Sequence, residues 1–139
     1  MMGGMDVAGL AAELAPALPR DAVITDRQRL RTYECDGLAH YRVIPALVVL
    51  PETGEQVAAV VRACASRRIP FVARGSGTGL SGGALPHAEG VLIVMSKMRD
   101  ILEIDLDNQR AVVEPGVINL QLTRAAQPSG YYFAPDPSS

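Results

Sequence analysis

The sequence predicts an α+β fold, and three observations support that prediction. The apolar run of strand length at residues 46–50 is typical of a strand buried on both faces, and a second such run at 91–95 is a further strand candidate. A segment with helical spacing separates the first run from a short strand at 70–73, and a crossover of this kind implies a parallel pair. The strands expected at 91–95, 101–106 and 111–113 then follow one another as a meander, without the regular alternation of an α/β protein.

The first helices are indicated by capping residues and helical spacing. Asp6 can cap a helix with an apolar face that includes Leu10 and Leu14, and Pro16 and Pro19 end it. A shorter, charged helix is expected over residues 26–33.

The later elements follow from the same kinds of pattern. Thr53 to Gln56 has the form of a capping box, and Val57, Val60 and Cys64 then recur at helical spacing as far as Arg67. Residues 107–109, Asp-Asn-Gln, are typical of a hairpin turn. Asn119 is expected to cap a last helix that runs to about residue 127.

Composition excludes several function classes. The chain has 139 residues, 48% of them hydrophobic, which is enough for a real core. Its 13 basic and 15 acidic residues are spread along the chain, so no basic stripe indicates nucleic-acid binding. Cys35, Cys64, His40 and His87 have no metal-ligand spacing, and both cysteines are expected to be buried or half-buried.

The sequence contains neither the pattern of a secretory signal nor an apolar run of the about 18 to 20 residues that a spanning helix needs. We therefore expect a soluble, cytoplasmic protein without a transmembrane segment.

The stretch VARGSGTGLSGGALP, residues 72–86, is the most informative part of the sequence. Residues 77–82 satisfy the dinucleotide pattern G-x-G-x-x-G, but Gly83 and Pro86 follow at once, where a Rossmann fold requires a helix. The Walker pattern fails because no Gly-Lys-Ser/Thr occurs. Neither standard nucleotide motif therefore explains the glycines.

A physical interpretation survives the failure of both motifs. A loop with five glycines can turn successive N–H groups inward as a concave nest for anionic oxygens. Ser76, Thr78 and Ser81 can add hydroxyl donors, and Arg74 either supplies a charge or pairs with a carboxylate to brace the loop. A flexible glycine-rich surface loop is the alternative.

The loop also resembles the pyrophosphate loop of one family. Together with LPETGEQVAAVVRAC at 50–64, VVEPGV at 112–117 and YYFAPDPSS at 131–139, it makes the chain from about Arg20 onward resemble the FAD-binding domain of the vanillyl-alcohol oxidase and p-cresol methylhydroxylase type. Within that family, the motifs especially resemble those of the FAD-linked subunits of glycolate oxidases.

The resemblance implies a fold and a cofactor site. The fold would be the N-terminal part of a two-subdomain FAD-binding fold, with an N-terminal helix in residues 1–19 and a C-terminally incomplete FAD-binding (PCMH-type) domain in residues 20–139. The cofactor-binding residues implied are Arg74, Gly75, Ser76, Gly77, Thr78, Gly79, Leu80, Ser81, Gly82, Gly83, Pro115, Gly116, Val117, Pro135, Asp136, Pro137, Ser138 and Ser139.

The roles of these segments are also implied by the resemblance. The glycine loop would hold the pyrophosphate, residues 115–117 would pass near the adenine or ribose, and residues 135–139 would approach the flavin. Asp136 either contacts the flavin or ribose or bonds to its own turn. The aromatic residues at 131–133 are expected to enter the core, with stacking on the flavin as the alternative. Thr78 stands where members with a covalent flavin carry histidine, so a non-covalent FAD is expected.

The function implied is FAD binding within an oxidase or dehydrogenase of 2-hydroxy acids such as glycolate or D-lactate. The reaction would pass a hydride from the substrate to the flavin. The chain stops where family members continue into a substrate domain, so we expect a fragment that is not catalytic alone and whose catalytic base lies outside it. Iron-sulfur electron-transfer subunits are expected partners, and these partners would provide any association with a membrane. The alternative function is a non-catalytic nucleotide- or phosphate-binding module.

Overall fold

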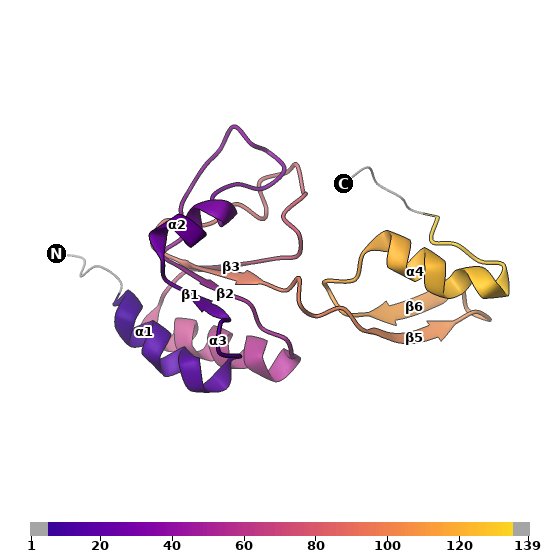
Figure 1. The fold of residues 1–139 in the computed structure, drawn as a ribbon, viewed down its shortest axis with the longest axis horizontal. Coiled ribbons are helices and arrows are strands. Elements are labelled where there is room, and N and C mark those ends of the chain that lie inside the picture. Colours follow the sequence, from indigo (N-terminus) through magenta and orange to yellow (C-terminus); the bar gives the residue numbers. More distant parts are fainter. Residues whose placement is uncertain (1–5, 135–139) are drawn as a thin grey trace.

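The computed structural model describes residues 6–134. Its helices are α1 (Val7–Leu14), α2 (Arg27–Leu30), α3 (Gly54–Arg67) and α4 (Asn119–Ala126), with short 3-10 turns at Ala15–Ala17, Arg31–Tyr33 and Gln127–Ser129. Its strands are β1 (Val23–Ile24), β2 (Leu47–Val49), β3 (Phe71–Arg74), β4 (Val91–Val94), β5 (Ile101–Asp105) and β6 (Arg110–Val113). These elements form two lobes joined by two extended connections (Figure 1).

The first lobe is built on a four-stranded sheet in the order β1-β2-β4-β3. Strands β2 and β3 both run parallel to β4, which lies between them, while β1 pairs antiparallel with β2. The carboxyl ends of the three parallel strands therefore meet at one edge of the sheet. The glycine-rich segment that follows β3 leaves the sheet at this edge.

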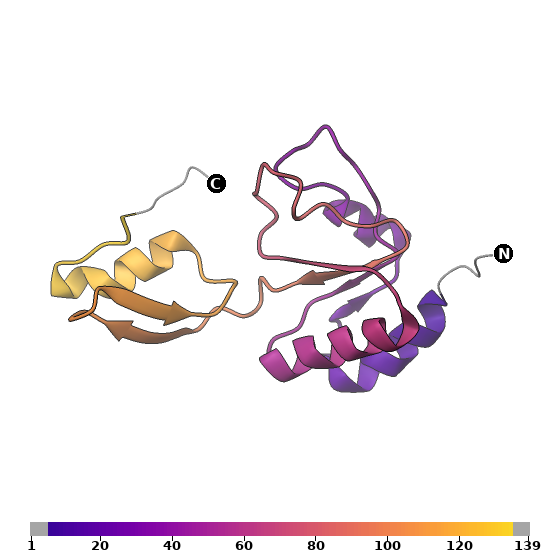
Figure 2. The same cartoon turned by 180° about the vertical axis from the view of Figure 1, so that it is seen from behind.

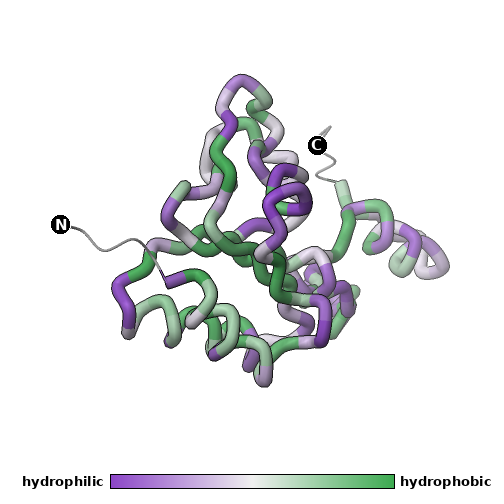
Figure 3. The backbone as a smooth tube through the Cα atoms, turned by 60° about the vertical axis from the view of Figure 1, so that its left-hand side comes forward, coloured by the Kyte–Doolittle hydropathy of each residue, from purple (hydrophilic) through white to green (hydrophobic). Residues whose placement is uncertain are grey.

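Alternate residues of the central strands face two different cores. Leu47 and Val49 pack with Leu10, Leu14 and residues of α3, whereas Val48 packs with Leu30 and residues from the opposite face. Helices α1 and α3 cover one face of the sheet and α2 lies on the other (Figures 1 and 2). The central strands are accordingly the most hydrophobic part of the backbone (Figure 3). The expectation that residues 46–50 contain a strand buried on both faces is confirmed for Leu47–Val49, and the strand candidate at 91–95 is found as β4, which is buried along its whole length.

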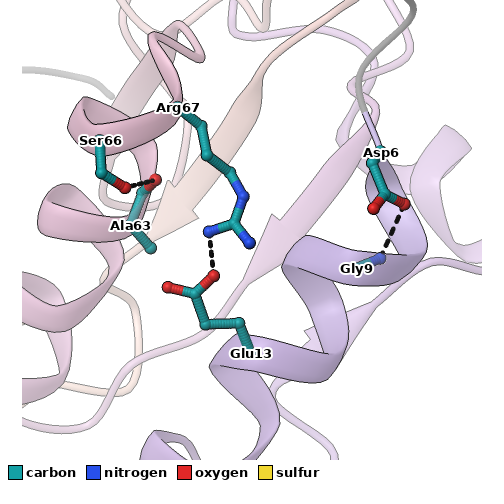
Figure 4. A network of polar contacts seen from close by, with 6 residues as sticks. All are labelled: Asp6, Gly9, Glu13, Ala63, Ser66 and Arg67. Atoms are coloured by element: carbon teal, nitrogen blue, oxygen red, sulfur yellow. Dashed lines mark hydrogen bonds and ion pairs between the residues drawn. The ribbon is translucent and has the colours of Figure 1, made fainter.

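Side-chain caps fix the ends of the two packed helices. Asp6 accepts a hydrogen bond from the backbone N–H of Gly9 at 2.9 Å, and Thr53 accepts one from Gln56 at 3.3 Å. An ion pair between Glu13 of α1 and Arg67 of α3 joins the helices at the surface (Figure 4). Because both side chains are partly exposed, this pair contributes at most about 1 kcal/mol, and the apolar contacts dominate the packing.

The second lobe is an antiparallel hairpin, β5-β6, with α4 beside it (Figure 1). Its predicted turn at 107–109 is confirmed, and Gln109 takes the left-handed conformation there with a φ of 53°. Leu102, Ile118 and Leu120 are each more than half exposed, and neither buried hydrophobic cluster includes a residue of this lobe. The described part of the second lobe is thus held mainly by hairpin hydrogen bonds.

The structure corrects three sequence expectations. Residues 91–94 do not begin a meander, because β4 pairs with β2 and β3 in the first sheet and not with β5, which belongs to the second sheet. Strand β4 thereby separates β2 from β3. The crossover strands are parallel as expected, but they are not neighbours. Asn119 is the first residue of α4, and the N-cap is Ile118. The backbone N–H of Ile118 donates to the side chain of Gln121 at 3.1 Å. Strand β1 was not expected, since two residues give too short a pattern.

Candidate cofactor site

The glycine loop, defined as residues 75–84, leaves the carboxyl end of β3. Crevices outside the carboxyl ends of parallel strands are the usual ligand sites of open sheets. The Arg74 carbonyl accepts a hydrogen bond from Met95 at 2.8 Å, so the start of the loop is tied to the chain that leaves β4. The sheet therefore fixes where the loop begins.

The backbone N–H groups of the loop have no hydrogen-bond acceptor among the described residues. From Gly75 to Ala84, no backbone N–H donates a hydrogen bond to another residue within 6–134, whereas Leu85 donates to Gly82 at 3.2 Å. Backbone donors in proteins are nearly always satisfied, by protein, by water or by a ligand. A continuous run of free donors is the structural property that an anion nest requires.

The glycines of the loop are present for two different reasons. Gly77 and Gly82 have a φ of 74°, a conformation that disfavours any side chain. Gly79 and Gly83 have no such φ, and a Cβ atom added at either would meet no described atom within 4 Å. The described residues therefore leave room for a side chain at Gly79 and Gly83. The close approach of a ligand to the backbone is a reason why these positions carry glycine.

Hydroxyl groups border the free donors. Ser76, Thr78 and Ser81 are all exposed, and within the described chain no hydrogen bond engages their hydroxyls. Leu80 is 67% exposed at the tip of the loop. Hydroxyl and amide donors are thus available together on the solvent side.

Arg74 lies beneath the loop and not on its open side. The side chain is only 8% exposed, and its Nη1 donates to the backbone carbonyl of Cys35 at 2.7 Å. The guanidinium carbon lies 5.5 Å from the centre of the Tyr33 ring, within range of a cation–π contact. Of the two roles considered for Arg74, the structure favours bracing the loop, although the acceptor is a carbonyl and not the expected carboxylate.

The charge of Arg74 is not fully compensated by direct contacts. Burial lowers the pKa of the guanidinium from its usual range, while neighbouring groups, including Asp36, act in the opposite direction. Asp36 is 6% exposed, and its Oδ2 and the Arg74 Nε are buried without a hydrogen-bond partner among the described residues. Arginine stays charged in proteins, so the negative charge of Asp36 stabilises the buried Arg74 cation.

The second motif, residues 115–117, meets the start of the loop. A Cβ atom on Gly75 would lie 3.4 Å from the carbonyl oxygen of Pro115. Gly116 donates to Met98 at 2.8 Å, and a Cβ there would lie 2.5 Å from that carbonyl oxygen. The structure therefore brings residues 115–117 and the glycine loop together, as the motif order suggested.

The third motif is only partly described. Residues 135–139, which include Asp136, lie outside the described residues. Tyr131 and Tyr132 are 41% and 72% exposed, so the expectation of core packing fails for both, while Phe133 is half-buried. Tyr132 and Phe133 line a pocket of about 220 Å³, smaller than the roughly 300 Å³ at which ligand pockets usually begin.

A second pocket, of about 420 Å³, opens between α2, β1 and the chain after β4, with Tyr33 in its wall. The glycine loop lines neither of these pockets. The anion site inferred at the loop therefore rests on the N–H groups that have no described partner, and not on either pocket.

Sequence reasoning missed the contribution of residues 33–38. The N–H of Gly37 donates to the carbonyl of Gly79 at 3.1 Å, and the carbonyl of Cys35 accepts a hydrogen bond from Arg74. Both Cys35 and Gly37 lie far from the loop in sequence. The dipeptide Asp36-Gly37 indicates a turn but not the segment that the turn contacts.

Cys35 is half-buried and Cys64 buried, as expected, and within residues 6–134 no group of acidic, cysteine and histidine side chains suits a metal ion. No helix in the same range is long and apolar enough to cross a membrane.

The donor set fits the pyrophosphate of a dinucleotide. Several adjacent N–H groups, three hydroxyls and two positions open where a Cβ would stand can surround oxygens of negative charge at close range. The buried Arg74 adds positive potential from below the loop.

Comparisons with known proteins agree with this fit. Residues 45–139 match the family described as FAD binding domain. Glycolate oxidase subunit GlcD of Escherichia coli K12 is 46% identical over 135 residues, which cover 97% of this chain and 27% of the relative. D-lactate dehydrogenase of Archaeoglobus fulgidus is 42% identical over 93 residues, which cover 67% of this chain and 21% of that protein.

The fold comparison is consistent. The structure of p-cresol methylhydroxylase with substrate bound superposes with a TM-score of 0.72 at 24% identity, over 92% of this chain and 26% of that one. The chain thus spans about a quarter of the proteins it matches. It belongs to the FAD-binding domain family, as the resemblance of its motifs implied, and its cofactor is FAD.

Proposed function

We propose that the chain binds FAD non-covalently, with the pyrophosphate on the glycine loop, as the cofactor-binding part of an oxidoreductase that acts on 2-hydroxy acids. The observation that supports this most directly is the run of N–H groups from Gly75 to Ala84 that have no acceptor within residues 6–134. A pyrophosphate supplies acceptor oxygens on both phosphorus atoms, so it can satisfy several of these donors at once.

Each segment of the site has its own part in this proposal. The backbone of residues 75–83 and the hydroxyls of Ser76, Thr78 and Ser81 hold the pyrophosphate, and Arg74 acts from below. Residues 115–117 border the adenosine half, since the Pro115 carbonyl lies 3.4 Å from where a Cβ on Gly75 would stand, and residues 135–139 approach the flavin. The FAD-binding domain then comprises residues 20–139, and α1 of the preceding segment packs on it.

The substrate class rests on the relatives. Their names specify a glycolate oxidase subunit and a D-lactate dehydrogenase, both of which concern 2-hydroxy acids. FAD supplies the two-electron oxidation of the CH–OH group. Because the chain covers 27% of the first relative, we propose that groups outside these 139 residues bind the substrate and take up its proton, and that the chain alone does not turn it over.

The word subunit in the name of that relative also supports a multi-subunit assembly. We propose that electrons leave through iron-sulfur partner subunits, that the assembly is cytoplasmic, and that any membrane contact is made by those partners.

A thermal unfolding series tests the cofactor assignment. Melting temperatures are measured with added FAD, FMN, ADP or no ligand. A ligand at 100 times its Kd stabilises the folded state by about 2.7 kcal/mol, so FAD should raise the melting temperature by several degrees. ADP should give a smaller rise because it retains the pyrophosphate, and FMN, which lacks it, should give the least. A response to FMN equal to that to FAD would contradict a site centred on the pyrophosphate, and no response to FAD would refute the proposal.

A further inference from the structure

We propose that the turn at Asp36-Gly37 is a positioning element of the cofactor site, which holds the glycine loop in its ligand-binding shape from below. This inference rests on the proposed function of the loop. It assigns a role to residues that precede the matched family region, residues 45–139.

The first support is a close backbone contact between segments far apart in sequence. Gly37 donates to the Gly79 carbonyl at 3.1 Å, and a Cβ on Gly37 would lie 2.5 Å from the Thr78 carbonyl oxygen and 2.9 Å from that of Gly79. Gly37 does not have a positive φ, so backbone conformation does not require glycine there. The close approach of the loop is the remaining reason. The two segments run side by side above the sheet in both views (Figures 1 and 2).

The second support is the enclosure of Arg74 between the same segments. Its guanidinium bonds to the Cys35 carbonyl on one side, and on the other side a Cβ on Gly77 would lie 3.0 Å from the guanidinium carbon. A side chain at Gly77 would therefore displace Arg74, and a shift of residues 33–36 would displace the loop. Arg74 transmits position from one segment to the other.

The third support is the carboxylate of Asp36. Its Oδ1 accepts from the N–H of Leu38 at 2.8 Å, which fixes the turn, while its Oδ2 is buried with no hydrogen bond to a described residue. The Nε of Arg74 likewise has no hydrogen-bond partner among the described residues, and the negative charge of Asp36 stabilises the buried guanidinium. Asp36 thereby couples the shape of the turn to the position of the buried cation.

The role of this turn differs from that of the loop itself. The free donors and open glycines of the loop face the ligand, whereas Gly37 and Asp36 act through Gly79 and Arg74. A change in the turn should therefore alter the loop before any ligand is added, and this property makes the inference testable without a bound cofactor.

The experiment uses ¹⁵N-labelled protein and the variants Gly37→Ala, Asp36→Asn and, as a matched control, Gly54→Ala. A Cβ at Gly54 meets nothing within 4 Å, and Gly54 also lacks a positive φ. Heteronuclear NOEs of the loop amides are recorded without ligand, and FAD affinity is then measured by titration. The Arg74 Nε–H resonance is followed as a spectroscopic signature of Asp36.

Gly37→Ala should lower the NOEs at residues 75–83 and weaken FAD binding by about tenfold or more, because small misplacements of a binding group are costly. Asp36→Asn, which keeps the side-chain shape, should move the Arg74 Nε–H resonance and weaken FAD binding to a smaller extent. Gly54→Ala should match the wild type in all three measurements.

Folded Gly37→Ala with unchanged loop NOEs and unchanged FAD affinity would overturn the inference. If Gly37→Ala does not fold, Asp36→Asn decides, and an unmoved Arg74 resonance together with wild-type affinity overturns the inference equally. Wild-type protein that does not bind FAD would refute the proposed function instead, and the loop NOEs would still test the positioning role.

Discussion

Gly79→Ala separates the stability of the fold from the binding of the cofactor. A Cβ at this position meets no described atom within 4 Å, and Gly79 does not have a positive φ. Replacing an unstrained glycine by alanine stabilises a protein by about 0.4–1 kcal/mol, because it reduces the freedom of the unfolded chain. The variant should therefore unfold at the wild-type temperature or slightly above it.

The effect on FAD binding should be opposite and larger. A methyl group between the pyrophosphate and the loop backbone would break at least one hydrogen bond to a charged acceptor, each of which contributes about 1.5–3 kcal/mol. This loss corresponds to a weakening of the Kd by about 10- to 150-fold. The opposite signs of the two effects distinguish this variant from an ordinary destabilising substitution.

Two measurements on the same samples test this expectation. Circular dichroism gives the unfolding temperature, and quenching of FAD fluorescence or titration calorimetry gives the Kd, with Gly54→Ala as the control. If Gly79→Ala bound FAD as tightly as the wild type does, the open glycines would have no role in ligand approach and the interpretation of the loop as a nest would be wrong.

Three further predictions concern the packing, the cysteines and the cofactor bond. Gly116→Ala should destabilise the fold by about 1–3 kcal/mol in urea unfolding, because its Cβ would lie 2.5 and 2.6 Å from the carbonyl oxygens of Met98 and Met95. An unfolding free energy equal to that of the wild type would show that the turn relaxes without strain. Burial raises the pKa of the Cys64 thiol, so the folded chain keeps a proton that the unfolded chain releases, and stability should fall as the pH rises above about 8.5. In thiol labelling of the native protein, half-buried Cys35 should therefore react before Cys64, and the reverse order would contradict the described core. Acid precipitation of FAD-loaded protein should leave all flavin in the supernatant, since Thr78 offers no histidine for a covalent bond; yellow precipitated protein would disprove this.

Local patterns in the sequence predict most of the elements. The capping residues Asp6 and Thr53 mark the starts of α1 and α3, and the apolar run Leu47–Val49 identifies a strand buried on both faces. These properties depend on residues near in sequence and on side-chain periodicity, which is why they can be found without a structure.

Strand order could not be obtained in this way. Residues 91–94 are suitable either for a meander or for the centre of the first sheet, and only the pairing of β4 with both β2 and β3 decides between them. The choice depends on how much apolar surface each arrangement buries in three dimensions, which periodicity does not encode.

In the candidate site, too, the local part could be predicted from the sequence and the long-range contacts could not. The glycine run identifies its own segment, because the loss of side chains is visible in the sequence itself. The supporting residues Cys35 and Gly37 were not found, since their partners Arg74 and Gly79 lie far along the chain and the hydrogen bonds are made to backbone carbonyls. The two roles considered for Arg74 could be separated only once its burial was known.

The most direct test of the central claim is a titration of ¹⁵N-labelled protein with FAD, followed amide by amide. The amides of Gly75 to Ala84, which donate to no described residue, should show the largest shifts, with smaller ones at residues 115–117, and ADP should reproduce a part of them. If FAD leaves the loop amides in place, or moves those around either pocket most strongly, the glycine loop is not the pyrophosphate site.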